Sequence, residues 1–487
     1  MSLSDPNLLR GHAYIDGAWV AGKSTFGVVN PADGSEVGRV ADLGAEETRQ
    51  AIAAAHRAFP AWAARTAKER AAILKTWHAL IMEYRDDLAR LMTMEQGKPL
   101  AEAAGEVAYG ASFVEWFAEE ARRVNGDVIP SHGPDKRIVV LRQPIGVVGA
   151  ITPWNFPNAM ITRKCAPALA VGCTVVVKPA EDTPLSALAL VELADRAGFP
   201  KGVVNVVTGR DPAAIGAEIA ANPLVRKVSF TGSTEVGKLL MRQCADTVKK
   251  VSLELGGNAP FIVFDDADLD AAVAGCMASK FRNAGQTCVC ANRVLAQEGV
   301  FDAFKEKLLA AVRGLKQGSG LEAGITQGPL INGEGLAKVE RLVASAIDAG
   351  AEVAIGGEKS NLGGTYYPPT VLTNVGLDME IAREEIFGPV AALYRFRTED
   401  EAVEIANDTP FGLAAYFYTR DLGRVWRVSE RLDYGIVGIN EGIVSTETAP
   451  FGGVKESGIG REGSARGIDD FVEIKYLCVG GVQAAGA

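Results

Sequence analysis

Histidine is scarce in this chain, with four among 487 residues. All four lie far upstream of the cysteine pair near residue 290, in segments with a helix or loop pattern: His12, His56, His78 and His132. A catalytic cysteine usually needs a neighbouring base, and histidine is the usual one. The distribution gives no support to a cysteine–histidine hydrolase, although folding can bring distant residues together.

Long apolar runs are missing as well. No stretch of about 18 apolar residues occurs, so no membrane span is expected. The first residues, MSLSDPNLLRGHAYIDG, contain no apolar stretch of signal-peptide length. Acidic residues exceed basic ones, 60 against 50, for a formal net charge of −10. Such a chain is poorly suited to nucleic acid or to an anionic membrane, so we expect neither as a partner.

Cysteine occurs seven times, an odd number spread thinly over a long chain. This pattern does not favour a secreted disulfide framework, and a reducing cytoplasm fits it better. Cys288 and Cys290 are too close together for a metal clip of the CxxC type, and no metal site is expected. Their stretch, FRNAGQTCVC, is small and polar, which raises the question whether one of them is a nucleophile.

The chain is longer than one hydrophobic core usually serves, so two or three lobes are expected. The first ~120 residues have a mostly helical pattern. After two strand-like stretches, KRIVVLRQP and IGVVGAITP, strands and helices alternate as in a doubly wound parallel α/β sheet. Such sheets bind ligands beyond the carboxyl ends of their strands. The loops to inspect are therefore 153–155, 178–181, 231–233 and 254–257.

Two glycine motifs nearly match known nucleotide-binding motifs. Residues 232–238, GSTEVGK, resemble a phosphate-binding P-loop, but Leu239 stands where a magnesium-binding Ser or Thr would be. The helix N-terminus there can still hold a pyrophosphate, or the motif is a plain strand-to-helix turn. The glycines of ESGIGREG follow no strand, so we interpret that motif as a loop.

Three residues suit one chemistry. If Cys288 is a nucleophile, Glu254 at a strand end between two leucines is a better partner than any histidine, because an apolar site raises a carboxyl pKa. Asn155 in PWNFP offers an amide for an oxyanion. The alternatives are a capping or salt-bridged Glu254 and a simple turn at Asn155. Together they suit thiolate addition to an aldehyde, hydride loss to a nicotinamide and hydrolysis of a thioester.

Seven motifs now show a family resemblance along nearly the whole chain, which resembles an aldehyde dehydrogenase. The spacings, 34 residues from Glu254 to Cys288 and 133 from Asn155 to Cys288, are also family-like. The motifs, in family order, are PWNFP, KPAEDTP, FTGSTEVG, LELGGNAP, GQTC, EEIFGPV and PFGGVKESGIGREG.

The resemblance implies an aldehyde dehydrogenase-like α/β fold in three parts. A Rossmann-type NAD-binding domain is expected in residues 1–121 and 145–256, and an α/β catalytic domain in residues 257–456. Strands in 122–144 and 472–487 would form a small β element for oligomerisation, and the final strand, YLCVGG, could pair with the RIVVL ribbon. A homo-oligomer, a tetramer in the first instance, is expected.

The resemblance also implies residue roles. Cys288 would be the nucleophile and Glu254 the base for deacylation, while Asn155 and the Cys288 N–H would hold the oxyanion. A carboxylate at Glu181 accepts ribose hydroxyls and repels a 2′-phosphate, which favours NAD, with NADP possible because Lys178 is near. The expected cofactor contacts are Trp154, Lys178, Glu181, Gly232, Ser233, Glu385 and Phe387.

Within the family, MITRK, KFRNAGQTCVC, GITQGPLIN and GINEGIVS resemble succinate-semialdehyde dehydrogenases, which act in 4-aminobutanoate degradation. This substrate carries a carboxylate opposite its aldehyde, and an arginine fork is suited to bind it. Arg163, Arg282 and Ser445 match the positions involved, with Thr446 as the alternative to Ser445. Glutarate semialdehyde, one methylene longer, stays open, because a methylene discriminates by only ~1–3 kcal/mol.

The resemblance also implies that Cys290 could form a reversible disulfide with Cys288, as succinate-semialdehyde dehydrogenases with the CVC pattern can. The alternative is that Cys290 is a small packing residue. A disulfide two residues apart would need a mobile loop. Among other functions, a coenzyme A-dependent acylating enzyme needs no water base, so Glu254 argues against it. A crystallin-like use of the fold is not expected with all three catalytic residues kept. Ester hydrolysis would be a side activity.

Overall fold

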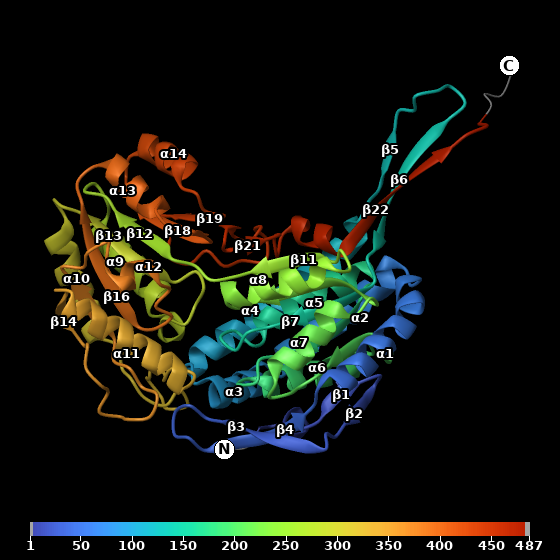
Figure 1. Cartoon of the computed structure of the whole chain (residues 1–487), viewed down its shortest axis with the longest axis horizontal. Helices are drawn as coiled ribbons and strands as arrows, with labels where there is room; N and C mark the ends of the chain where they lie inside the picture. The colour runs from blue at the N-terminus through green and yellow to red at the C-terminus, as the bar shows by residue number, and fades with distance from the viewer. Residues whose placement is uncertain (1–2, 483–487) are drawn as a thin grey trace.

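The larger of two mainly parallel sheets provides the framework for the site (Figure 1). A computed structural model describes residues 3–482. The sheet order is β2-β1-β9-β8-β7-β10-β11-β21, and its five central strands are parallel. In chain order these strands run third, second, first, fourth, fifth, so the order reverses between β7 and β10. The strands are β1 (Ala13–Ile15), β2 (Ala18–Val20), β7 (Val147–Ile151), β8 (Thr174–Lys178), β9 (Val204–Val206), β10 (Val225–Thr231), β11 (Lys250–Glu254) and β21 (Gly458–Ile459).

Helices cover both faces of this sheet because its central strands are apolar on both sides. Val147 and Ile151 of β7 pack with α1, α7 and α8, whereas Val148 and Ala150 pack with the helices of the other face. Such two-sided burial is typical of parallel sheets. The helices of this half are α1 (Ala45–Ala63), α2 (Ala67–Glu83), α3 (Arg85–Gln96), α4 (Leu100–Glu120), α5 (Ala159–Val171), α6 (Pro184–Ala197), α7 (Pro212–Ala221) and α8 (Thr234–Ala245).

The second sheet has the order β14-β15-β16-β13-β12-β18-β19, with only the edge strand β14 antiparallel. Separate apolar clusters cover its two faces. Its strands are β12 (Ala259–Val263), β13 (Ala291–Gln297), β14 (Glu352–Ile355), β15 (Thr370–Thr373), β16 (Val390–Phe396), β18 (Ala414–Tyr418) and β19 (Ile436–Ile439). Its helices are α9 (Leu269–Lys280), α10 (Phe301–Arg313), α11 (Gly333–Asp348), α12 (Glu380–Arg383), α13 (Glu399–Asn407) and α14 (Leu422–Arg431).

An arm of three antiparallel strands projects from the body (Figure 1). It consists of β5 (Asp127–Ile129), β6 (Arg137–Pro144) and β22 (Val472–Val479), and Tyr476 of β22 pairs with Val140 of β6. The predicted pairing of the final strand with the RIVVL ribbon is therefore confirmed. All three residues of β5 and all of β22 after Val472 are exposed.

The N-terminal segment differs in part from the prediction. Helices fill residues 45–120 as expected, but residues 13–42 form four strands, β1, β2, β3 (Ser24–Val29) and β4 (Glu36–Asp42). The first two are three residues long and add to the edge of the large sheet through β9, a tertiary pairing that local pattern does not reveal. Within residues 3–482, no helix combines the length and the apolar character needed to cross a membrane.

The chain passes from one sheet to the other at residues 255–258, directly from the end of β11 to the start of β12. The loops that follow β7 and β10 therefore face loops that precede β12, β13 and β16 across one cavity. Carboxyl ends of the first sheet meet amino ends of the second there.

Candidate active site

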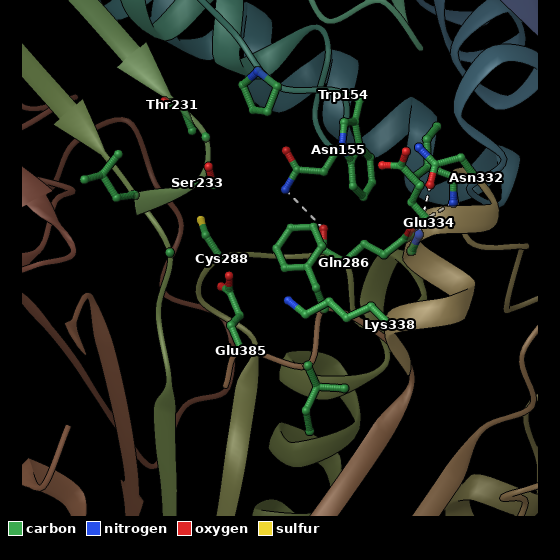
Figure 2. Close-up of a pocket in the computed structure, with 18 residues that line it drawn as sticks. Trp154, Asn155, Thr231, Ser233, Gln286, Cys288, Asn332, Glu334, Lys338 and Glu385 are labelled. Atoms are coloured by element: carbon green, nitrogen blue, oxygen red, sulfur yellow. Dashed lines mark hydrogen bonds between the residues drawn. The ribbon is translucent and has the colours of Figure 1, made fainter. Parts of the chain in front are cut away.

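The central cavity lies at the reversal point of the first sheet and has a volume of about 430 Å³ (Figure 2). Loop 153–155 after β7 and loop 231–233 after β10 both line it, as the strand pattern predicted. The opposite wall comes from the second sheet and from the start of α11. The residues that line the whole cavity include Trp154, Asn155, Gly232, Ser233, Gly256, Gln286, Cys288, Asn332, Glu334, Lys338, Glu385 and Phe387.

Two aromatic rings form one side of this cavity. Trp154 and Phe387 meet edge to face, with ring centroids 5.5 Å apart at 89°. Phe387 has a φ of 55°, a conformation that is costly for a bulky residue and that the surrounding structure must hold. Beside it, the Glu385 Oε1 accepts a hydrogen bond from the Gly257 N–H at 3.0 Å, and burial raises the pKa of Glu385 to about 7.

Two helix N-termini line the cavity from different sides. Ser233 caps α8, with its Oγ accepting from the Val236 N–H at 3.3 Å. Asn332 caps α11 by accepting from the Gly335 N–H at 2.9 Å. Lys338, one turn further along α11, also lines the cavity (Figure 2). Asn332, Glu334 and Lys338 were not predicted, because they lie at the start of a helix and not in a loop that follows a strand.

Glu181 and Lys178 lie one cavity away. Glu181 lines a neighbouring space of about 600 Å³ that shares Ile331 and Asn332 with the central cavity. Lys178 is buried behind it and donates from Nζ to Glu181 Oε2 at 2.8 Å. A ligand long enough to run from Phe387 past Asn332 would reach Glu181.

Cys288 lies in the wall of two cavities at once. It lines the central cavity and also a second one of about 280 Å³ on its other side. Burial raises the pKa of the Cys288 thiol to about 12, against a smaller lowering effect of the Arg163 charge. Asn155 stands close by, and its Nδ2 donates to the Gln286 carbonyl at 3.1 Å (Figure 2). The second hydrogen of that amide is left for another acceptor.

The two glycines after β11 make different contacts. Gly256 lines the central cavity, where a residue without a side chain allows a ligand to approach the backbone closely. Gly257 instead admits another loop, because a Cβ there would lie 2.7 Å from the Cys288 carbonyl oxygen. The strand end and the cysteine loop are therefore held in direct contact.

Glu254 ends β11 as predicted, but its carboxyl lies outside the lining of both cavities within the described chain. Burial and the nearby charge of Glu462 raise its pKa well above the ordinary value, and its Oε2 has no hydrogen-bond partner among residues 3–482. Glu462 forms ion pairs with both Lys164 and Arg163. Burial acts to raise the pKa of Glu462, but the two positive charges outweigh it and lower the pKa. Glu462 lies in the ESGIGREG motif, for which the sequence predicted a loop and no role for this carboxylate.

The second cavity brings together the three residues expected to bind a carboxylate. Arg163 of α5, Arg282 after α9 and Ser445 before the final segment all line it. Thr446, the alternative to Ser445, instead donates to Glu447 at 3.4 Å. Aromatic rings hold the cations: the Arg163 guanidinium lies 4.1 Å from the Phe451 centroid, and the Arg282 guanidinium 5.4 Å from that of Phe156.

Cys290 lies away from both cavities. It is buried, and its Sγ donates weakly to the carbonyls of Lys280 at 3.4 Å and Ala291 at 3.6 Å. Both it and Cys288 are free thiols. Contact between the two sulfurs requires the loop to rearrange.

Comparisons with known proteins agree with this site. The aldehyde dehydrogenase family model matches residues 19–477. A succinate-semialdehyde dehydrogenase of Escherichia coli (strain K12) whose name carries NADP(+) is 62% identical over 99% of this chain and 100% of its own. A glutarate-semialdehyde dehydrogenase of Pseudomonas aeruginosa and a 3-sulfolactaldehyde dehydrogenase of Pseudomonas putida are each 61% identical, again over 99% of this chain and 100% of their own.

Among solved structures, the crystal structure of succinate-semialdehyde dehydrogenase from Burkholderia pseudomallei superposes with a TM-score of 0.98 at 62% identity. The match covers 99% of this chain and 100% of that one. The predicted fold class and family resemblance are both confirmed. The chain belongs to the aldehyde dehydrogenase family.

Proposed function

We propose that the protein oxidises succinate semialdehyde to succinate with a nicotinamide dinucleotide. The observation that carries this proposal is the position of Cys288 in the wall of two different cavities. One has the aromatic wall and helix N-termini suited to a dinucleotide. The other has two arginines suited to a carboxylate. A single thiol can thus meet both ligands of an oxidation.

The names of the relatives support an acidic aldehyde as substrate. All three name an aldehyde with an anionic group away from the reacting carbon, a carboxylate in two and a sulfonate in one. Their identities to this chain, 61% and 62%, do not separate them. Glutarate semialdehyde is the second candidate, since it differs from succinate semialdehyde by one methylene.

The central cavity fits the cofactor. The N-terminus of α8, capped by Ser233 beside Gly232, suits a pyrophosphate. Glu385 would hold the hydroxyls of the nicotinamide ribose, with the ring near Trp154 and Phe387. Lys178 and Glu181 would hold the adenosine ribose, and the carboxylate favours NAD over NADP. When bound, the nicotinamide supplies the hydride acceptor.

The chain's own groups would perform the other steps. The Cys288 sulfur gives up its proton to Glu254, which releases it to solvent, and the sulfur bonds to the aldehyde carbon. The resulting oxyanion is met by Asn155 Nδ2 and the Cys288 N–H. After loss of hydride, the carbon is a thioester. Glu254 takes a proton from water, whose oxygen attacks that carbon, and the C–S bond breaks to release succinate. Within residues 3–482, the Glu254 Oε2 makes no hydrogen bond that would have to break before it could accept a proton from this water.

The proposal extends to organisation and compartment. Residues 1–121 and 145–256 would form the cofactor domain and 257–456 the catalytic domain, with residues 1–2 outside the described part. Strands in 122–144 and 472–487, of which 483–487 also lie outside it, would assemble a tetramer. Seven free cysteines suit a reducing cytoplasm.

The test is the formation of NADH from NAD, or of NADPH from NADP, by the purified, reduced protein. The aldehydes are succinate semialdehyde, glutarate semialdehyde and butanal. We expect both acidic aldehydes to exceed butanal in kcat/KM, succinate semialdehyde to lead, and NAD to exceed NADP. Equal rates with butanal would remove the acidic substrate and leave a general aldehyde dehydrogenase. A lead for glutarate semialdehyde would select the second candidate.

A further inference from the structure

Tyr109 places an unsatisfied phenol in the second cavity. It lies on α4, four residues before Phe113, and the two rings meet edge to face with centroids 5.0 Å apart. The Tyr109 Oη is buried and makes no hydrogen bond of ordinary geometry within residues 3–482, although the Ser445 hydroxyl lies close to it. A buried hydroxyl left unpaired costs free energy, so such a group calls for an absent partner.

Two of the charged groups around this phenol are donors only. Arg163 and Arg282 line the same cavity, and a guanidinium carries no acceptor, whereas the neighbouring Ser445 hydroxyl can donate or accept. Arg163 Nη2 and Arg282 Nε are themselves buried without a hydrogen-bond partner in the described chain. Three residues with unpaired hydrogen-bond donors among the described residues therefore line the same cavity.

The carboxylates of the same cavity are already occupied. Glu106 accepts from Lys98 and from the Asn158 N–H at 2.9 Å. Glu102 accepts from the Asn283 N–H at 2.7 Å. The rest of the described lining carries no charge: most of it is apolar, and Thr287 and Ser445 add hydroxyls. An outside anion is therefore the natural partner for the free donors.

The backbone holds Tyr109 against this spot. Gly110 allows α4 to approach α5 closely, since a Cβ there would lie 3.3 Å from the Ala159 Cα. This contact sets Tyr109 beside Arg163 of α5. Ser112 Oγ donates to Glu447 Oε2 at 3.2 Å, which ties α4 to the loop that carries Ser445.

We propose that Tyr109 is a specificity-determining residue that donates its phenolic hydrogen to the terminal carboxylate of the substrate. This inference rests on the function proposed above and deepens it. A carboxylate has about four lone-pair positions on two oxygens, which matches the two guanidiniums, the phenol and the Ser445 hydroxyl. The two arginines supply charge, and the phenol adds a fourth, oriented donor.

The test is Tyr109→Phe, which removes one oxygen and keeps the ring. A hydrogen bond to a charged group is worth roughly 10- to 100-fold in binding. We expect kcat/KM for succinate semialdehyde to fall by about that factor, mainly through KM, with butanal unchanged. Succinate should also protect Cys288 from iodoacetamide less well in the variant, a readout that needs no turnover.

Tyr394→Phe is the matched control. The Tyr394 Oη is likewise buried without a hydrogen-bond partner in the described residues, but it lies on β16 in the core of the second sheet. It should leave the preference for succinate semialdehyde over butanal unchanged.

The outcomes separate this inference from the function on which it rests. If the parent protein prefers succinate semialdehyde and Tyr109→Phe keeps that preference, Tyr109 does not bind the carboxylate. An equal loss with both aldehydes would also overturn the inference. If the parent protein itself shows no preference, the proposed function fails, and the role of Tyr109 fails with it.

Discussion

The Cys288 thiol is protonated in the structure as it stands, because burial raises its pKa to about 12. A reactive cysteine normally has a lowered pKa. The charge that lowers this pKa most is that of Arg163, which an ion pair with Glu462 and an incoming carboxylate would both partly neutralise. Activation must therefore come from a base or from the bound ligands. Burial and the Glu462 charge raise the pKa of Glu254, which makes its carboxylate a stronger base than an ordinary one.

Cys290 can be tested as the redox partner of Cys288. Peroxide should inactivate the parent protein reversibly if the two sulfurs join, because a disulfide is restored by thiol reductant. In Cys290→Ala we expect the same exposure to give a loss that reductant does not recover, since Cys288 would oxidise further. The measurement is activity before peroxide, after it, and after reductant.

Cys276→Ala is a suitable control, because Cys276 is also buried but lies on α9 in the core of the second sheet. It should behave like the parent protein. Equal recovery in Cys290→Ala would identify Cys290 as a packing residue, in line with its hydrogen bond to the Lys280 carbonyl.

At the scale of elements, the N-terminal helices hold the loop of the oxyanion residue. Lys98, between α3 and α4, is buried, forms an ion pair with Glu106 and donates to the Asn155 carbonyl at 2.7 Å. Glu106 in turn accepts from the N–H groups of Asn158 and Ala159 at the start of α5. Helix α5 carries Arg163, so one buried pair supports both cavities.

Lys98→Met should therefore destabilise the protein by about 3–5 kcal/mol, because it leaves the Glu106 charge buried and unpaired. Guanidinium unfolding measures the change. The double variant Lys98→Met/Glu106→Gln should recover most of the loss, since the amide is neutral and still accepts at α5. Lys238→Met, which breaks an exposed pair with Glu456, should cost at most about 1 kcal/mol. A similar small cost for Lys98→Met would contradict the buried-pair argument.

The first sheet and half of the central cavity could be predicted from the sequence. Buried apolar runs with polar ends mark β7, β8, β10 and β11, and a parallel sheet gathers their carboxyl ends at one edge. The other half of the site precedes its strands or lies on helices. Lys338 and Tyr109 are spaced like ordinary helix residues, and only the packing of α11 and α4 brings them to Cys288 and Arg163.

In the whole molecule, the arm exposes apolar side chains that the described part of the same chain does not cover. Val128 is 81% exposed and Ile474 71%, and among residues 3–482 no strand pairs with the outer side of β5. Exposed apolar strands of this kind are protected in native proteins by pairing or covering. The arm therefore suits contact with other copies of the chain.

Val128→Asp/Ile474→Asp should reduce the assembly to smaller species, seen as a lower mass by light scattering after size-exclusion chromatography. Both side chains lie in solvent in the isolated chain, so the fold should survive, which circular dichroism checks. Glu473→Gln, on the same strand, should leave the mass unchanged. A parent protein that is already monomeric, or a variant of unchanged mass, would show that the arm does not join subunits.

The placement of Cys288 between two cavities also has a consequence for the order of events. The two partners of the oxidation reach one sulfur from opposite sides, so neither must depart before the other arrives. The enzyme would therefore work through a ternary complex. A high concentration of the aldehyde would not block the entrance of the cofactor, nor the reverse. The rate would therefore depend on the concentration of each one separately.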